Sequence, residues 1–306
     1  MVEQKLFGVI PPLLTLFNRD GSVDYKATCK LAEFLSKYVH GLFVCGTYGG
    51  GPLMTEPERM KLVEKLTETL QNKVPLVVHI GTTNTPEAIR LAKHAEKCGA
   101  IAVASVPPYY YHYSNQQVLK HFTEIVDSVS IPVYVYNNPK TVGYGISSEL
   151  LKNLEAVGVK GVKDSSFDIL VLEDYKRTCS KNFDVVLGTE AMFMIAHFLL
   201  DIQAFIPGLA NAFPEIVRQF FDACMANEVA QAKLMHEKIL KLRKIAYQAG
   251  SSNMGVLALL HIRGFKSGYP RLPFEPVSED LFEKMRAQVS EVFCGDIPAI
   301  EDMTKM

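Results

Sequence analysis

The chain has 306 residues, of which 48% are hydrophobic and 21% charged, with a formal net charge of −1. This length fits one barrel or two ordinary domains, and the near-zero charge excludes a global basic field that would hold nucleic acid. Six cysteines are spread without a Cys-x-x-Cys pair and eight histidines without metal-site spacing, so we expect reduced thiols and no metal. The first residues lack the apolar core of a signal peptide and no apolar run is long enough to span a membrane, which favours a cytoplasmic protein.

Short apolar runs alternate along the chain with longer segments whose apolar residues recur every three or four positions. This alternation predicts eight strand-helix units and therefore a closed (β/α)8 TIM barrel of the α/β class. No Gly-x-Gly-x-x-Gly follows the first run, which disfavours a dinucleotide-binding sheet. The expected strands cover residues 8–14, 41–45, 75–81, 101–106, 132–137, 159–164, 184–188 and 203–207.

Helices are expected between these strands, for example over residues 25–37, 56–71 and 86–97, the last with Thr85 as its N-cap. Beyond the eighth strand the helical pattern continues without strands. Helical segments are predicted over 213–243, 251–263 and 279–292, with a Gly- and Pro-rich irregular stretch over 264–273. We therefore expect a barrel over residues 1–225 and a C-terminal helical extension over 226–306 packed on it.

Lys163 closes the sixth apolar run, just before the turn-forming Asp164, Ser165 and Ser166. In barrels of this class, the carboxyl ends of the strands carry the chemistry. An ammonium held among apolar walls loses hydration, so its pKa falls and the nucleophilic free amine becomes accessible near neutral pH. The alternative is that Lys163 reaches solvent or pairs with Asp164.

Tyr136 ends the strand one unit upstream of Lys163, so both side chains can face the same region. Alternation along the strand puts Tyr134 and Tyr136 on one face, pointing into the barrel, and the intervening valines on the other. A core ring with a satisfied hydroxyl is the other interpretation of Tyr136. The Gly49-Gly50-Gly51 turn after the second strand can hold a carboxylate or phosphate, or can simply be a tight connection.

Taken together, these strand-end motifs resemble the pyruvate-dependent class I aldolases of the dihydrodipicolinate synthase and N-acetylneuraminate lyase superfamily. The resemblance covers nearly the whole chain. Its motifs are Gly8-Val9-Ile10-Pro11-Pro12, Gly46-Thr47-Tyr48-Gly49, Pro108-Tyr109-Tyr110, Tyr136-Asn137-Asn138-Pro139, Gly161-Val162-Lys163-Asp164 and Gly268-Tyr269-Pro270-Arg271-Leu272-Pro273.

The resemblance implies that Lys163 forms a Schiff base with the 2-keto carbon of a pyruvate-type acid, without any cofactor. Tyr136 would transfer a proton to or from the C4 hydroxyl, and Thr47 and Tyr110 would relay it. In relatives the counterpart of Tyr110 reaches across a subunit interface, and a homotetramer built as a dimer of dimers is expected. The backbone amides of Thr47 and Tyr48 would bind the substrate carboxylate. Further substrate-binding residues would lie at the ends of the seventh and eighth strands: Gly188, Thr189, Glu190 and Ile206.

Departures from the family motifs narrow the expected reaction. Thr141 stands where dihydrodipicolinate synthases place an arginine, and Tyr48 and Gly50 replace a threonine and a glutamate of the usual second-strand motif. The motifs are most similar to those of 2-keto-3-deoxygluconate aldolases. The leading hypothesis is therefore a lyase that reversibly cleaves a 2-keto-3-deoxy sugar acid to pyruvate and an aldehyde. The alternatives are an N-acetylneuraminate lyase, a dihydrodipicolinate synthase-like condensation, a dehydratase using the same imine, and a barrel that only binds a keto acid.

Overall fold

The computed structural model describes residues 5–300. Within this range, eight parallel strands form one sheet in the order β1-β8-β7-β6-β5-β4-β3-β2. Pro12, just after β1, and Phe43 of β2 form a further parallel bridge. This curled parallel sheet with helices in its connections is consistent with the predicted (β/α)8 barrel. The strands are β1 (Gly8–Val9), β2 (Leu42–Val44), β3 (Leu76–His79), β4 (Ala102–Ser105), β5 (Val133–Asn137), β6 (Gly161–Asp164), β7 (Asp184–Leu187) and β8 (Ala204–Phe205).

The first strand is much shorter than its apolar run. Pro11 and Pro12 have no backbone N–H, so regular ladder pairing stops after Val9. The chain nevertheless stays against its neighbours, because Ile10 N donates to Phe205 O at 3.0 Å and Leu13 N to Phe43 O at 2.9 Å. The run predicted as a strand is therefore one regular pair followed by an irregular extended segment.

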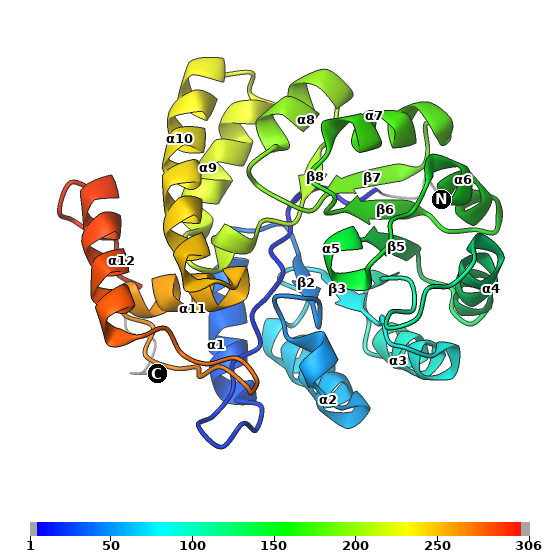
Figure 1. Cartoon of the computed structure of the whole chain (residues 1–306), viewed down its shortest axis with the longest axis horizontal. Helices are drawn as coiled ribbons and strands as arrows, with labels where there is room; N and C mark the ends of the chain where they lie inside the picture. The colour runs from blue at the N-terminus through cyan, green and yellow to red at the C-terminus, as the bar shows by residue number, and fades with distance from the viewer. Residues whose placement is uncertain (1–4, 301–306) are drawn as a thin grey trace.

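Helices connect successive strands around the sheet (Figure 1). Thr85 is the first residue of its helix and not the predicted N-cap. Asn84 has that role, since its side chain accepts a hydrogen bond from Glu87 N at 3.0 Å. The Thr85 hydroxyl instead contacts His121 Nδ1 at 2.9 Å. The connecting helices are α1 (Tyr25–Ser36), α2 (Glu56–Leu70), α3 (Thr85–Lys97), α4 (Asn115–Val126), α5 (Pro139–Val142), α6 (Ser148–Ala156), α7 (Ile169–Thr178) and α8 (Phe193–Leu200), and α9 (Pro214–Met225) follows the last strand.

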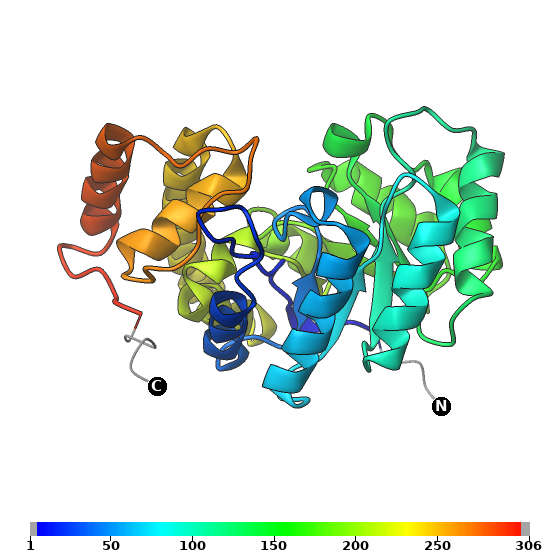
Figure 2. The same cartoon turned by 90° about the horizontal axis from the view of Figure 1, so that it is seen from below.

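The predicted helical segment 213–243 is two helices, because the backbone turns at Asn227 with φ of 58° between α9 and α10 (Val229–Ala246). Helices α11 (Ser252–Ile262) and α12 (Glu279–Val292) follow. Figures 1 and 2 show α10, α11 and α12 gathered at one side of the barrel, with α12 outermost. The division at residues 225 and 226 stays a prediction, and its residues 1–4 and 301–306 lie outside the described range.

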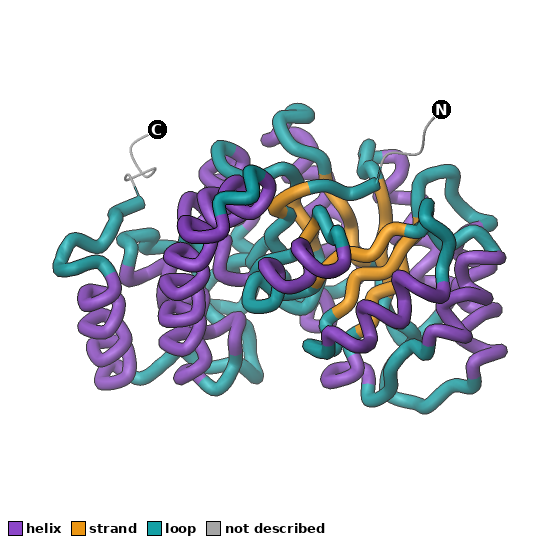
Figure 3. Tube along the Cα trace, turned by 90° about the horizontal axis from the view of Figure 1, so that it is seen from above, coloured by secondary structure: helices purple, strands orange, loops and turns teal. Residues whose placement is uncertain are grey.

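Two apolar clusters meet at the strands, which the tube in Figure 3 shows surrounded by helices. Tyr134 and Tyr136 belong to the small cluster inside the barrel, with Phe43 and Ile206. The alternate residues of β5 belong to the large cluster between strands and helices. The predicted inward orientation of the two tyrosines is confirmed. None of the helices in residues 5–300 is long and apolar enough to cross a membrane.

Candidate active site

Lys163 lies on β6 beside Tyr136 of β5, its register partner, and its side chain is buried. Its Nζ is 3.7 Å from the centre of the Tyr136 ring and 4.0 Å from that of Phe43. Asp164 is engaged elsewhere, since its two carboxylate oxygens accept hydrogen bonds from Asn137 and Ser166. Lys163 therefore neither reaches solvent nor pairs with Asp164, and its neighbours are aromatic rings. This is the environment expected for a buried nucleophilic amine.

Burial and mutual contact shift the proton affinity of both groups. Burial lowers the pKa of the Lys163 ammonium, and the neighbouring Tyr136 offsets only part of that effect. For Tyr136, burial raises the pKa, but the charge of Lys163 and hydrogen bonds from neighbouring side chains outweigh it. The net pKa of Tyr136 therefore lies below that of an ordinary phenol. A less basic amine thus faces a more acidic phenol.

The Tyr136 hydroxyl is held by groups from three loops. Thr47 Oγ1 lies 3.5 Å from it and Asn138 Nδ2 donates to it at 3.0 Å. Ser165 supplies a further hydrogen bond that favours the phenolate. The contact between Thr47 and Tyr136 agrees with the predicted pairing of these hydroxyls. Sequence reasoning gave no role to Asn138 or Ser165, although both directly follow strand ends that carry predicted site residues.

The loop after β2 leaves two adjacent backbone N–H groups available. Among residues 5–300, the amides of Thr47 and Tyr48 donate to no protein group. The loop closes on itself behind them, because Gly51 N donates to Gly46 O at 3.0 Å. Gly50 has φ of 62°, a conformation that favours glycine. Adjacent free amides in a tight turn are suited to an anion such as a carboxylate.

The Tyr48 side chain packs toward the end of β8 and the C-terminal helices. A Cβ added to Gly208 would overlap the Tyr48 ring, so the two are in direct contact. Burial and the nearby Glu190 carboxylate raise the pKa of Tyr48, and a hydrogen bond with Ser252 partly opposes them. Glycine at 208 leaves room for the phenol ring of Tyr48.

The predicted residues that follow β7 and β8 lie around this region, where Thr189, Glu190 and Ile206 are buried and Gly188 is partly buried. Gly188 packs so closely on Ser165 that a Cβ there would overlap its hydroxyl, and the Thr189 hydroxyl accepts from Ala191 N at 3.2 Å. Ile206 lies in the inner cluster with Tyr136.

Glu190 forms an ion pair with a residue of the C-terminal helices. Its Oε1 is 2.8 Å from Arg243 Nη1 of α10, while its Oε2 has no hydrogen-bond partner among the described residues. Burial opposes the charge on Arg243, but Glu190, Tyr247 and Tyr48 outweigh it and raise the pKa of Arg243. Glu190 was predicted for the site; Arg243 was not, because it lies 53 residues further along the chain.

Tyr110 does not join the cluster within one chain. Its side chain is 83% exposed, its φ is 82°, and its ring packs edge-on against Tyr111 at 5.0 Å. The neighbouring Tyr109 turns inward instead and packs against the inner cluster. In residues 5–300, no group of three His, Cys, Asp or Glu side chains is placed to hold a metal ion.

The chain is similar to known proteins over nearly its whole length. A family model described as the dihydrodipicolinate synthetase family matches residues 5–292. A 4-hydroxy-tetrahydrodipicolinate synthase of Archaeoglobus fulgidus is 30% identical over 280 residues, covering 91% of this chain and 96% of the relative. A 2-dehydro-3-deoxy-D-gluconate/2-dehydro-3-deoxy-phosphogluconate aldolase of Thermoproteus tenax is 32% identical over 290 residues, covering 92% of this chain and 90% of the relative.

Among solved structures, YagE from Escherichia coli K12, a prophage protein crystallised in complex with pyruvate, superposes with a TM-score of 0.89. It is 25% identical, and the match covers 94% of this chain and 99% of that one. The chain belongs to the dihydrodipicolinate synthetase family.

Proposed function

We propose that this protein is a class I aldolase that reversibly cleaves a 2-keto-3-deoxy sugar acid to pyruvate and an aldehyde. The observation that carries the proposal is the buried Lys163 amine, 3.7 Å from the ring centre of Tyr136. Burial lowers the pKa of Lys163, which increases the fraction of free amine at neutral pH.

In the proposed reaction, Lys163 Nζ attacks the C2 carbonyl and water leaves, giving a protonated imine. Tyr136, as a phenolate, removes the proton of the C4 hydroxyl. The C3–C4 bond then breaks, its electron pair enters the imine as an enamine, and the aldehyde departs. Protonation of C3 and addition of water release pyruvate and restore the amine. The lowered pKa of Tyr136 supports its role as the base.

The free amides of Thr47 and Tyr48 are proposed to bind the substrate carboxylate. Thr47 lies in this loop and its hydroxyl is beside Tyr136, so the loop would place C1 of the substrate next to the proton-transfer group. No metal or cofactor is needed to balance the reaction.

At the other end of the substrate, we propose that Glu190 contacts hydroxyls of the sugar-acid chain. Its unpartnered, buried Oε2 supports this role, because a buried carboxylate oxygen gains from a hydroxyl donor. A dihydrodipicolinate synthase-like condensation is disfavoured by Thr141, because this residue supplies no positive charge for the second polar end of the substrate. The Thr141 hydroxyl donates to the backbone oxygen of Asn138, the N-cap of α5. The synthase among the relatives keeps this alternative open to direct assay.

We further propose a homotetramer in which Tyr110 completes the site of a neighbouring subunit. The exposed pair of Tyr110 and Tyr111 supports this arrangement, as aromatic rings are enriched at protein interfaces. The exposed Leu170, Ile195 and Leu199 on α7 and α8 offer a second apolar surface.

The decisive experiment is to incubate the protein with pyruvate and sodium borohydride and to analyse its peptides by mass spectrometry. A reduced pyruvyl adduct on Lys163 is expected, and its absence would refute every Schiff-base mechanism. Pyruvate release would then be measured with keto-deoxy sugar acids, N-acetylneuraminate and, in the condensing direction, aspartate semialdehyde. An adduct without turnover of any of these would favour a keto-acid-binding barrel.

A further inference from the structure

The loop that carries Thr47 and Tyr48 begins in a constrained conformation. Cys45, a non-glycine residue at the end of β2, has φ of 59°. A Cβ on Gly51 would overlap the carbonyl of Cys45, so the chain doubles back with no spare room. Constrained backbone of this kind persists only where the surrounding structure holds it. A residue that binds the far end of this loop can therefore fix its conformation.

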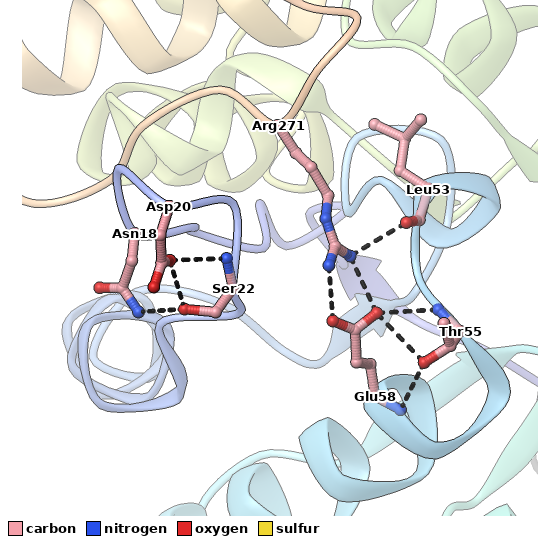
Figure 4. Close-up of polar contacts among 7 residues, drawn as sticks. All are labelled: Asn18, Asp20, Ser22, Leu53, Thr55, Glu58 and Arg271. Carbon is pink, nitrogen blue, oxygen red and sulfur yellow. Dashed lines mark hydrogen bonds and ion pairs between the residues drawn. The ribbon is translucent and has the colours of Figure 1, made fainter.

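Arg271, from the irregular segment between α11 and α12, binds that far end (Figure 4). Its Nη1 donates at 3.0 Å to the backbone oxygen of Leu53, which is the last residue of the 3-10 turn η1 (Gly51–Leu53). Both guanidinium nitrogens also bind Glu58, at 2.6 and 2.8 Å. Glu58 Oε2 in turn accepts from Thr55 N at 2.9 Å, as part of the capping box of α2. One guanidinium thus joins the end of the loop to the start of the next helix.

The same guanidinium also packs on the other side of the loop. It lies over the Phe17 ring, 5.0 Å from the ring centre, and Tyr269 N donates to Phe17 O at 2.9 Å. The Phe17 ring in turn touches Gly50, where an added Cβ would sit 3.5 Å from it. The loop is therefore held between the Phe17 segment, the start of α2 and Arg271. The carboxylate-binding amides are three and four residues before Gly51 in this enclosed loop.

We propose that Arg271 is a positioning residue that holds the loop after β2 so that the amides of Thr47 and Tyr48 face the carboxylate of the keto acid. This inference rests on the proposed function. Removing Arg271 should loosen the end of the loop and its contacts with Phe17 and the start of α2, while Lys163 and Tyr136 stay in place on their strands. The expected effect is weaker binding of pyruvate with little change in the rate of imine formation at saturation.

The test measures the rate of borohydride-trapped adduct formation as a function of pyruvate concentration. For Arg271→Met, the half-saturating pyruvate concentration should rise about 10-fold while the limiting rate stays within about 3-fold. Arg271→Lys, which keeps the charge but loses the planar two-nitrogen contact with the Glu58 carboxylate, should lie between this variant and the parent. Glu58→Gln approaches the same contact from the partner side and should raise the half-saturating concentration as well.

Arg286→Met is the matched control, because Arg286 pairs with Glu283 on the exposed surface of α12 at 3.3 Å. It should leave the pyruvate dependence unchanged. Thermal unfolding of each variant separates loop positioning from general destabilisation. If Arg271→Met and Glu58→Gln unfold at lower temperature but keep the parent's half-saturating concentration, the inference is overturned while the proposed function stands. If the parent protein forms no adduct, the proposed function fails and the inference fails with it.

Discussion

Tyr134 and Tyr136 sit on the same face of β5, two residues apart, and are about equally buried, at 3% and 4% exposure. Their hydroxyls nevertheless meet opposite surroundings. The Tyr134 hydroxyl, toward the amino end of the barrel, donates to Asp184 Oδ2 at 2.8 Å. The Tyr136 hydroxyl, at the carboxyl end, accepts from Asn138 at 3.0 Å, and Lys163 lies against its ring.

The comparison shows how neighbours, and not burial, divide structural from reactive phenols. A phenol beside a carboxylate is held in its protonated, donating form. A phenol beside a cation and N–H donors is moved toward the phenolate, the form that can accept a proton. Tyr134, at the amino end of the barrel, therefore has a structural role as a donor to Asp184, and Tyr136, at the carboxyl end, can act as a base. Four experiments test this distinction.

The largest effect is expected at Lys163. Lys163→Ala should abolish the pyruvate adduct and lower cleavage by on the order of 10⁵-fold, because no other group supplies the imine. Mass spectrometry and a pyruvate-release assay measure both effects. Circular dichroism should remain that of the folded parent. Loss of folded protein would show that Lys163 is a structural residue, and the contrast between a structural amino end and a reactive carboxyl end of the barrel would no longer hold.

Exchanging the two phenols for phenyl rings tests the comparison directly. Tyr136→Phe should lower kcat by about 10² to 10³-fold while keeping the adduct on Lys163, because only proton transfer is lost. Tyr134→Phe should keep kcat but lower the free energy of unfolding by about 1–3 kcal/mol, because a hydrogen bond to the buried Asp184 is lost. Steady-state kinetics and urea unfolding provide the two measurements. Equal losses of kcat in both variants would contradict the assigned roles.

The site at the carboxyl end of the barrel, unlike the amino end, is expected to need Tyr110 from a second subunit. Tyr110→Ala should lower kcat by about 10 to 100-fold, since the relay of the proton from Tyr136 is interrupted. Co-expression of Tyr110→Ala with Lys163→Ala should give mixed oligomers more active than either variant alone, because one site regains both residues. Purified mixed oligomers without this recovery would show that Tyr110 does not act across an interface.

The smallest effect concerns Asp184, whose pKa is raised by burial, with the hydrogen bonds from Tyr134 and Leu6 opposing it. The folded state therefore keeps its proton to higher pH than the unfolded state, so stability from this group is gained as pH falls and lost as pH rises through that range. Asp184→Asn keeps an acceptor oxygen and removes the titration. The stability of the parent relative to this variant should increase by about 1 kcal/mol between about pH 8 and pH 4. A difference that does not change with pH would show that Asp184 is not titrating in this range.

The parts of this protein that depend on local geometry could be predicted from its residues alone. Alternation with a period of two placed Tyr134 and Tyr136 inside the barrel, and the end of an apolar run placed Lys163 beside Tyr136. The family resemblance added roles for these side chains. Even locally the helix cap was ambiguous, since both Asn84 and Thr85 are residue types that cap helices, and in the structure the Asn84 side chain accepts from Glu87 N while the Thr85 hydroxyl contacts His121.

The groups that surround each predicted residue come from distant parts of the chain and are known only from the fold. Asp184 reaches Tyr134 from 50 residues away, and Arg271 reaches Glu58 from 213 residues away. Periodicity carries no information about such partners, because they are selected by strand register and by the packing of helices that follow the barrel. Two tyrosines on the same strand face therefore differ in role because of their neighbours in the fold: Tyr134 is a structural hydrogen-bond donor and Tyr136 is a candidate base.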